Sequence, residues 1–197
     1  PPSLGHVCPF CLDLALTRKR SAPVEAPMRS ITSGATEAPK KTGTLKGHTG
    51  CVNSILFSHD GSRTYTGSDD ECMAVWKTDI LVGSNEEEFN CRENSHCWEV
   101  YNTSHTNNLF YVRDIVGTQG QKVVTCAADG KVILHSIPSS GGHFETNLVK
   151  HKGRAHRIAM TPELPNVIMS AGEDSLIHVI DLDSGDCHGI CATASFC

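Results

Sequence analysis

The sequence of 197 residues lacks several features that would assign a function directly. No apolar run approaches the ~18 residues that a membrane-spanning helix needs, so we expect no membrane span. The formal net charge is −5, which argues against nonspecific nucleic-acid binding because such binding needs a basic surface. The nucleophile motif Gly-x-Ser-x-Gly and a Gly-rich phosphate loop are also missing. We therefore expect a protein that is not an enzyme and that binds neither membranes nor nucleic acid.

Charge and proline divide the sequence into two parts. Residues 1–44 carry a net charge of +3 and six of the nine prolines, whereas residues 45–197 carry −8. The first part has no sustained hydrophobic period, so we predict a mobile basic leader. Asp13 interrupts its short apolar segment, which argues against a secretory signal. The basic run 18–20 is too short for a firm nuclear signal, so a solvated charge run is favoured and we expect the cytoplasm, the nucleus or both.

A repeat occupies the acidic part of the chain. Three times, a hydroxyl residue precedes an aspartate by four positions, and an apolar run ends six positions after that aspartate. A histidine precedes the hydroxyl residue by 18, 20 and 19 positions. Strand-like runs separated by turn signals such as Asp60-Gly61 predict repeated antiparallel sheets. The three sets are His48, Thr66 and Asp70, then His105, Thr125 and Asp129, then His151, Ser170 and Asp174.

The segment from Gly47-His48 to Trp76 resembles a WD repeat, although Lys77 stands where that family has aspartate. The family signature is Gly-His near the start and Trp-Asp near the end of a unit of ~40–45 residues. The resemblance implies an all-β WD-repeat β-propeller with about three visible four-stranded blades. We place them at residues 45–80, 103–137 and 149–183, with an acidic insertion loop at 83–103 and an irregular Cys-rich tail at 184–197. Propellers close with ~4–8 blades, and the sequence begins with Pro1 rather than Met, so we expect part of a larger ring.

The resemblance also implies a chain of hydrogen bonds through His, Ser or Thr, Asp and Trp that locks each blade. Only the first repeat has all four residues, because it ends on Trp76. At the Trp position the second repeat has His135 and the third has Ile180. A satisfied polar network rigidifies the structure around it, so we predict that the second and third blades are less rigid than the first.

Four short motifs narrow the resemblance. The segments 47–53, 66–70, 151–156 and 170–174 are similar to those of the cullin-4-associated substrate receptors, and most of all to the factor-eight branch. Such receptors dock on the damage-binding adaptor of the ligase and present targets for ubiquitination. They often end a blade with Trp-Asp-x-Arg, whose Arg helps to dock the adaptor, but here Asp79 and Asp183 take that position. A general WD-repeat scaffold with no ligase connection therefore remains the alternative.

In a propeller of this kind, the loops before the first strand and between the second and third strands lie on one rim, which commonly binds partners. The stretch 150–157 is the most basic of the repeat region, and it predicts that Arg side chains here bind an acidic protein partner. A solvated loop around a buried His151 is the alternative. The rim residues that we predict to bind partners are Thr49, Cys51, Asp69, Asn107, Asn108, Lys152, Arg154, His156 and Glu173.

Ten cysteines raise the question of a metal site. Cys8 and Cys11 have zinc-ligand spacing, and a second group of Cys187, His188, Cys191 and Cys197 lies near the other end. Structural zinc usually takes four ligands as two close pairs, and these groups are far apart in sequence, so we expect no metal and no cofactor. We expect Cys51, Cys72 and Cys126, which fall on or beside strand patterns, to be small buried side chains.

Overall fold

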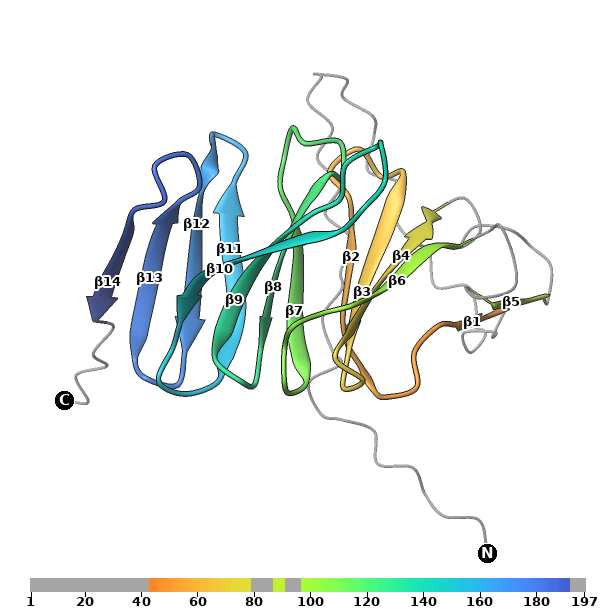
Figure 1. Ribbon diagram of the computed structural model, residues 1–197, viewed down its shortest axis with the longest axis horizontal. Coiled ribbons are helices and arrows are strands. Elements are labelled where there is room, and N and C mark those ends of the chain that lie inside the picture. The colour runs from red at the N-terminus through yellow and green to blue at the C-terminus, as the bar shows by residue number, and fades with distance from the viewer. Residues whose placement is uncertain (1–42, 79–86, 91–96, 192–197) are drawn as a thin grey trace, which may run out of the picture. The chain divides into compact units, whose positions relative to one another are not determined.

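A computed structural model describes residues 43–78, 87–90 and 97–191, which lie within one compact unit formed by residues 42–197. Fourteen strands are described, and twelve of them form three four-stranded antiparallel sheets (Figure 1). No described residue lies in an α-helix, and these ranges accordingly hold no helix suited to crossing a membrane. The all-β fold and the three blade-like sheets confirm the predicted fold class. The leader, the run 18–20 and three of the terminal cysteines (8, 11 and 197) lie outside the described residues.

Each sheet is built from strands that follow one another along the chain. The first sheet has the order β2 (Val52–Phe57), β3 (Arg63–Ser68), β4 (Cys72–Lys77) and β6 (Cys97–Asn102). The second sheet, read from its inner edge, consists of β7 (Leu109–Asp114), β8 (Lys122–Ala127), β9 (Lys131–Ser136) and β10 (Phe144–Lys150). The third consists of β11 (Ala155–Thr161), β12 (Leu164–Gly172), β13 (Leu176–Asp181) and β14 (Cys187–Cys191). The two remaining strands, β1 (Gly43–Lys46) and β5 (Glu87–Asn90), pair in parallel.

The outer strands of the first and third sheets lie where irregular chain was predicted, and the outer strand of the second sheet begins within residues 138–148, which no predicted blade included. The expected acidic insertion loop at 83–103 contains β5 and β6, and β6 completes the first sheet. The expected irregular tail contains β14, which completes the third sheet. The sheets therefore run over 52–102, 109–150 and 155–191, later in the chain than the predicted blades. The difference arises because each predicted blade counted the residues before its first strand and omitted the outer strand.

Two apolar cores hold the sheets together. The first lies between the first and second sheets, where Gly67 allows a close approach, since a Cβ there would sit 2.8 Å from Cγ2 of Val112. The second lies between the second and third sheets. Burial of such side chains is the main stabilising term of the fold. The first core contains Tyr65, Met73, Val75, Leu109, Val112 and Val123, and the second contains Ile115, Val124, Cys126, Val132, Ala155, Ile158, Ile168 and Ile180.

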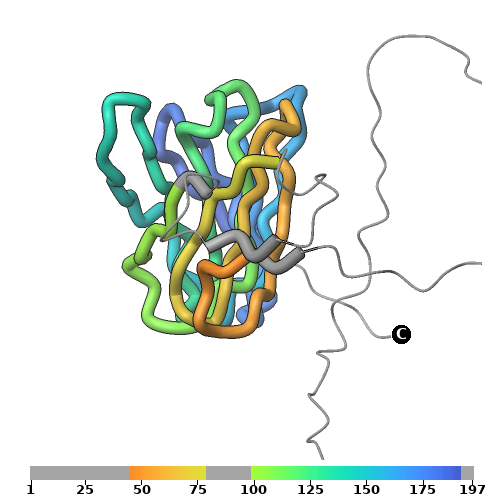
Figure 2. The backbone as a smooth tube through the Cα atoms, turned by 90° about the vertical axis from the view of Figure 1, so that its right-hand side faces the viewer, coloured from red at the N-terminus to blue at the C-terminus, as the bar shows by residue number. Residues whose placement is uncertain are grey.

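The two end sheets expose apolar side chains on the faces that turn away from the second sheet. Side chains alternate along a strand, so Ile55 and Phe57 lie on the opposite face from Tyr65 and Gly67, which face the second sheet. Ile55 is 44% exposed and Phe57 38%. Figure 2 looks onto the first sheet from this side. On the third sheet Met169 and Ile190 are exposed in the same way. Such faces are typical of blades that belong to a larger ring.

Candidate interaction surface and the networks beneath it

A chain of hydrogen bonds fastens the first sheet from Trp76 to Asp70. The indole N–H of Trp76 donates to Oγ1 of Thr66 at 2.9 Å, and this oxygen lies 2.7 Å from Nε2 of His48. Nδ1 of His48 lies 3.1 Å from both carboxylate oxygens of Asp70. The carboxylate of Asp70 can only accept, so a neutral His48 carries its proton on Nδ1, and its Nε2 accepts from the Thr66 hydroxyl. The order of donors along this network is therefore fixed.

The aspartate at the end of each network holds two loops together. Asp70 accepts backbone N–H bonds from Thr49 at 2.7 Å and from Cys72 at 3.1 Å. Burial raises the pKa of Asp70, but these bonds outweigh burial and the pKa is lowered. Asp129 and Asp174 make the same pair of backbone bonds, with Thr106 and Lys131 and with Lys152 and Leu176 respectively. Each carboxylate thus joins the loop before the first strand to the turn between the second and third strands.

The second network is complete, contrary to the prediction. Oγ1 of Thr125 lies 2.8 Å from Nε2 of His105 and 2.7 Å from Nε2 of His135, and Nδ1 of His105 lies 3.1 Å from Asp129. His135 takes the place of the tryptophan because an imidazole N–H can donate as an indole N–H does. His105 follows β6 of the first sheet by three residues, yet its ring makes its hydrogen bonds with Thr125 and Asp129 of the second sheet.

The third network ends one residue earlier, as the sequence predicted. His151 makes 2.9 Å contacts with both Ser170 and Asp174. Ile180 has no polar atom to extend the chain, and its side chain is buried in the core between the second and third sheets. Asp174 nevertheless keeps a pKa of about 2, because the bonds from His151, Lys152 and Leu176 outweigh its burial.

The predicted rim residues lie along one edge of the sheets, the lower edge in Figure 1, on loops except for His156, which lies at the start of β11. Thr49 and Lys152 serve there as backbone donors to the aspartates. Asp69 accepts a hydrogen bond from the side chain of Asn53, which also reaches the carbonyl of Leu109 at 3.0 Å and so joins the first sheet to the second. The backbone N–H of Asn108 donates to the side chain of Asn107 at 2.9 Å, and the carbonyl of Asn108 accepts the backbone N–H of Ala128 at 2.9 Å.

The cysteines on and beside the strands differ in burial. Cys126 is buried in the core between the second and third sheets, as predicted. Cys72 is half-buried. The prediction for Cys51 is wrong, because this residue precedes β2 on the rim and is exposed. A residue that lies next to a strand in the sequence does not necessarily turn its side chain toward the buried face of the sheet.

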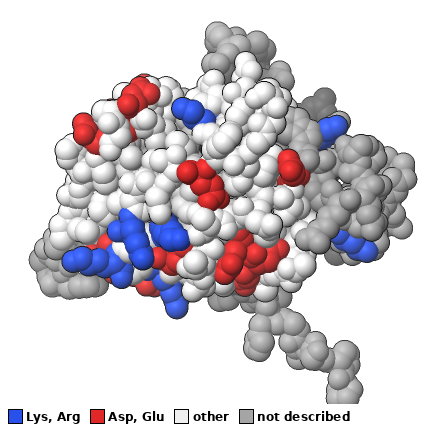
Figure 3. All heavy atoms as spheres, viewed as in Figure 1, with Lys and Arg blue, Asp and Glu red and all other residues white. Residues whose placement is uncertain are grey.

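Charged and aromatic side chains come together where the third sheet meets the rim. Glu173 accepts the backbone N–H of Arg154 at 3.2 Å and lies 4.0 Å from its guanidinium and 3.3 Å from Nε2 of His156. The ring of His156 stacks on Phe110 with centroids 5.2 Å apart. Figure 3 shows Lys and Arg side chains gathered toward the lower left of this view, beside acidic ones. The rim of the third sheet thus combines exposed charge with an aromatic neighbour.

Two residues of this surface were missed by reasoning from the sequence. Phe110 and Tyr111 belong to β7 of the second sheet, and Arg157 lies over the ring of Tyr111 with 5.1 Å to its centroid. The contacts arise because β7 packs beside β11, and no local pattern in the sequence signals which strands of two neighbouring sheets lie side by side.

Comparison with known proteins agrees with this architecture. The WD domain, G-beta repeat family matches residues 39–77. Over 146 residues the chain is 33% identical to human WD and tetratricopeptide repeats protein 1, covering 73% of this chain and 19% of that protein. It is 29% identical over 145 residues to Protein ALTERED SEED GERMINATION 2 of Arabidopsis thaliana, covering 70% of this chain and 17% of that protein.

A further relative carries the name of a ligase factor. The chain is 27% identical over 176 residues to human DDB1- and CUL4-associated factor 6, covering 83% of this chain and 18% of that protein. The mouse protein of the same name is 28% identical over the same length. The chain thus spans less than a fifth of the length of the curated relatives it matches.

The repeated sheets, with a His–hydroxyl–Asp network in each, define a class of protein built from propeller blades. Within that class the chain is a WD-repeat protein, and it is related to the cullin-4-associated receptors. The finer likeness to the factor-eight branch stays a prediction.

Proposed function

We propose that this chain is part of a substrate receptor of a cullin-4 RING ubiquitin ligase, which binds target proteins and presents them for ubiquitination. The observation that carries the proposal is the similarity to DDB1- and CUL4-associated factor 6 along 83% of the chain. The receptor acts by binding rather than by catalysis. Its partners are the damage-binding adaptor of the ligase and the target protein.

In this proposal, the adaptor does not bind at the ends of the described blades. In the third sheet the position of the docking Arg is held by Asp183, which accepts a hydrogen bond from the side chain of Asn166 and donates its own N–H to Asp181 at 2.9 Å. In the second sheet the corresponding residue is Pro138. A carboxylate that is tied into a turn and a proline cannot replace a guanidinium, so another part of the full-length protein supplies the docking residues.

The target is held by the rim of the third sheet. Arg154 is 60% exposed on its side chain and is paired with Glu173 at 4.0 Å, which is the geometry of a weak surface ion pair. Such a pair contributes ~0–1 kcal/mol, so a carboxylate of a partner can compete for the guanidinium. Arg157 adds a second positive charge beside the ring of Tyr111. An acidic segment of a target protein fits this surface.

The ligase connection is tested by purifying the tagged full-length gene product from its own cells and quantifying the damage-binding adaptor and cullin-4 in the eluate. We expect both to be recovered at near-stoichiometric levels. Recovery of partners without either component would favour the alternative, a WD-repeat scaffold with no ligase connection.

The rim is tested by reversing its charge. We expect Arg154→Glu together with Arg157→Glu to weaken the recovery of acidic partner proteins several-fold in a pull-down, while the blade stays folded because both side chains lie at the surface. Lys122→Glu is the matched control, since it makes the same kind of charge change at an exposed position on the opposite edge of the second sheet. Equal recovery with all three proteins would show that this rim does not hold the target.

A further inference from the structure

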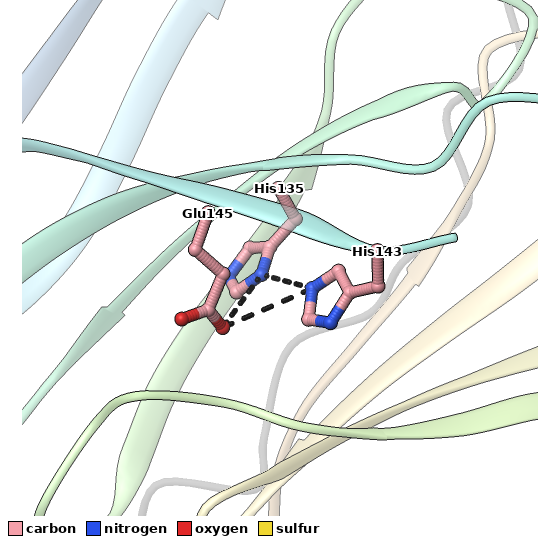
Figure 4. Close-up of side chains that lie close together, drawn as sticks. All are labelled: His135, His143 and Glu145. Atoms are coloured by element: carbon pink, nitrogen blue, oxygen red, sulfur yellow. Dashed lines mark hydrogen bonds and ion pairs between the residues drawn. The ribbon is translucent and has the colours of Figure 1, made fainter.

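A cluster of two histidines and a glutamate lies at the outer side of the second sheet, beyond the end of its hydrogen-bonded network. His135 on β9 and Glu145 on β10 are paired in register, and His143 directly precedes β10. Nδ1 of His135 lies 2.9 Å from Nε2 of His143 and 3.4 Å from Oε1 of Glu145. Nε2 of His143 lies 3.8 Å from the same carboxylate oxygen. Figure 4 shows the three side chains converging on one point.

The network beneath this cluster fixes which nitrogen of His135 carries a proton. Burial lowers the pKa of His105, so its ring is neutral, and its Nδ1–H donates to Asp129. Nε2 of His105 must then accept from the hydroxyl of Thr125 at 2.8 Å. That hydroxyl has one hydrogen, so its contact of 2.7 Å with His135 requires a proton on Nε2 of His135. A neutral His135 therefore turns an unprotonated Nδ1 toward the cluster.

The three side chains bring three possible ligand atoms to one point. The lone pair of His135 faces Oε1 of Glu145 at 3.4 Å, and a cation bound by both atoms would relieve their repulsion. His143 adds a third atom that can carry a lone pair. A proton on Nε2 of His143 makes a hydrogen bond to Nδ1 of His135 at 2.9 Å, whereas an unprotonated Nε2 leaves all three atoms free to bind a metal ion.

The spacing of the three atoms fits a metal. Zinc binds imidazole nitrogen and carboxylate oxygen at ~2.0–2.2 Å, and in a tetrahedral site the ligand atoms are then about 3.3–3.5 Å apart. The three separations here are 2.9, 3.4 and 3.8 Å, which lie on both sides of that value. We propose that Nδ1 of His135, Nε2 of His143 and Oε1 of Glu145 form a zinc site, with water as the fourth ligand.

Neighbouring groups hold the three ligands in place. The hydroxyl of Thr125 fixes the tautomer and the orientation of His135. The backbone N–H of Ser104 donates to both carboxylate oxygens of Glu145 at 3.1 Å, and the ring of Tyr101 packs against His143 with centroids 4.9 Å apart. The side chains of His143 and Glu145 are 19% and 21% exposed, so an ion can reach the site from solvent. A bound ion would tie β9 to β10 and to the loop that joins them.

A second group of possible metal ligands differs from this cluster in where its protons lie. His151, Asp174 and His178 also lie close together. There Nδ1 of His151 is 2.9 Å from Asp174 and carries the proton that the aspartate accepts, so of the two histidines only His178 can offer a lone pair to an ion. His178 is therefore a matched control, a half-buried histidine in the corresponding sheet outside the proposed site.

The experiment measures zinc binding to the metal-free full chain with Zn²⁺ alone as the probe, by equilibrium dialysis and by zinc X-ray absorption. We expect one equivalent bound through nitrogen and oxygen only. His143→Ala and Glu145→Gln should each weaken this equivalent by more than the ~10–100-fold that loss of an outer hydrogen-bond partner costs. His178→Ala should leave it unchanged.

These variants leave the buried network intact, because His143 and Glu145 lie beyond His135. Zinc binding that is unchanged in both variants, or a ligand shell containing sulfur, would overturn the proposal and assign the bound zinc to cysteines. Absence of binding to the folded chain would also overturn it, and would assign the 2.9 Å contact to a hydrogen bond from the Nε2–H of His143 to Nδ1 of His135.

Discussion

Replacing Thr66 by valine removes one hydroxyl and keeps the side-chain volume, so its effect isolates the hydrogen bonds of the first network. Oγ1 of Thr66 has two partners, Nε2 of His48 at 2.7 Å and the indole N–H of Trp76 at 2.9 Å. Trp76 is 1% exposed, and the side chain of His48 is 5% exposed. Water therefore cannot replace the lost oxygen, and two buried polar groups lose their partner.

The expected cost follows from counting these groups. An unsatisfied buried polar group costs ~1–3 kcal/mol, so Thr66→Val should lower the free energy of opening by about 2–6 kcal/mol. In the third sheet Ser170 has one partner, His151, and Ser170→Ala should cost about half as much. The ratio of the two costs is the stronger test, because both substitutions remove a single buried hydroxyl.

Hydrogen exchange of two backbone amides measures these costs locally. The N–H of Thr49 donates to Asp70 at the end of the first network, and the N–H of Lys152 donates to Asp174 at the end of the third. We expect exchange at Thr49 to be at least ~30-fold faster in Thr66→Val, since ~1.4 kcal/mol corresponds to a factor of ten. Equal free-energy costs for the two substitutions would refute the reasoning that the threonine hydroxyl bridges two partners.

Three further outcomes are expected. Gly130→Ala should lower Tm well beyond Gly117→Ala, because both have φ above +80° but only at Gly130 would a Cβ meet backbone oxygens, the nearest at 2.5 Å. An acid unfolding series should show that the stability contributed by Asp174 is complete above its ordinary pKa of 3.8 and is lost as the pH falls through about 2, since its folded pKa is lowered. Mass spectrometry after brief alkylation of the native chain should find Cys51 labelled and Cys126 unlabelled, because burial raises the pKa of Cys126 to about 12, and similar labelling of both would contradict the fold.

The inner strands and their turns could be predicted from the sequence because they repeat a local pattern. The aspartates at 70, 129 and 174 each accept the N–H of the residue two positions later, which is a bond that short-range spacing can signal. The outer strands could not be predicted in this way. All five residues of β14 are exposed, so this strand has no alternation of buried and exposed residues to mark it.

The candidate sites depended on contacts that the sequence does not encode locally. We predicted a broken second network because His135 replaces a tryptophan there. The network needs only an N–H donor, however, and imidazole supplies one as indole does. No metal was expected, because the candidate ligands considered were those near the two ends of the chain, which are far apart in sequence. His143 and Glu145 reach His135 only because β9 and β10 form a hairpin in a particular register.

The path of the chain from one sheet to the next has a consequence for how the molecule comes apart. The segment that follows β6 leaves the first sheet and is fastened within three residues to Thr125 and Asp129 of the second, and His151 repeats this arrangement after β10. Melting of the second sheet therefore also releases the segment that follows the first sheet's outer strand. Neighbouring sheets are coupled through their covalent connections as well as their apolar cores, so we expect them to unfold as one cooperative unit rather than sheet by sheet.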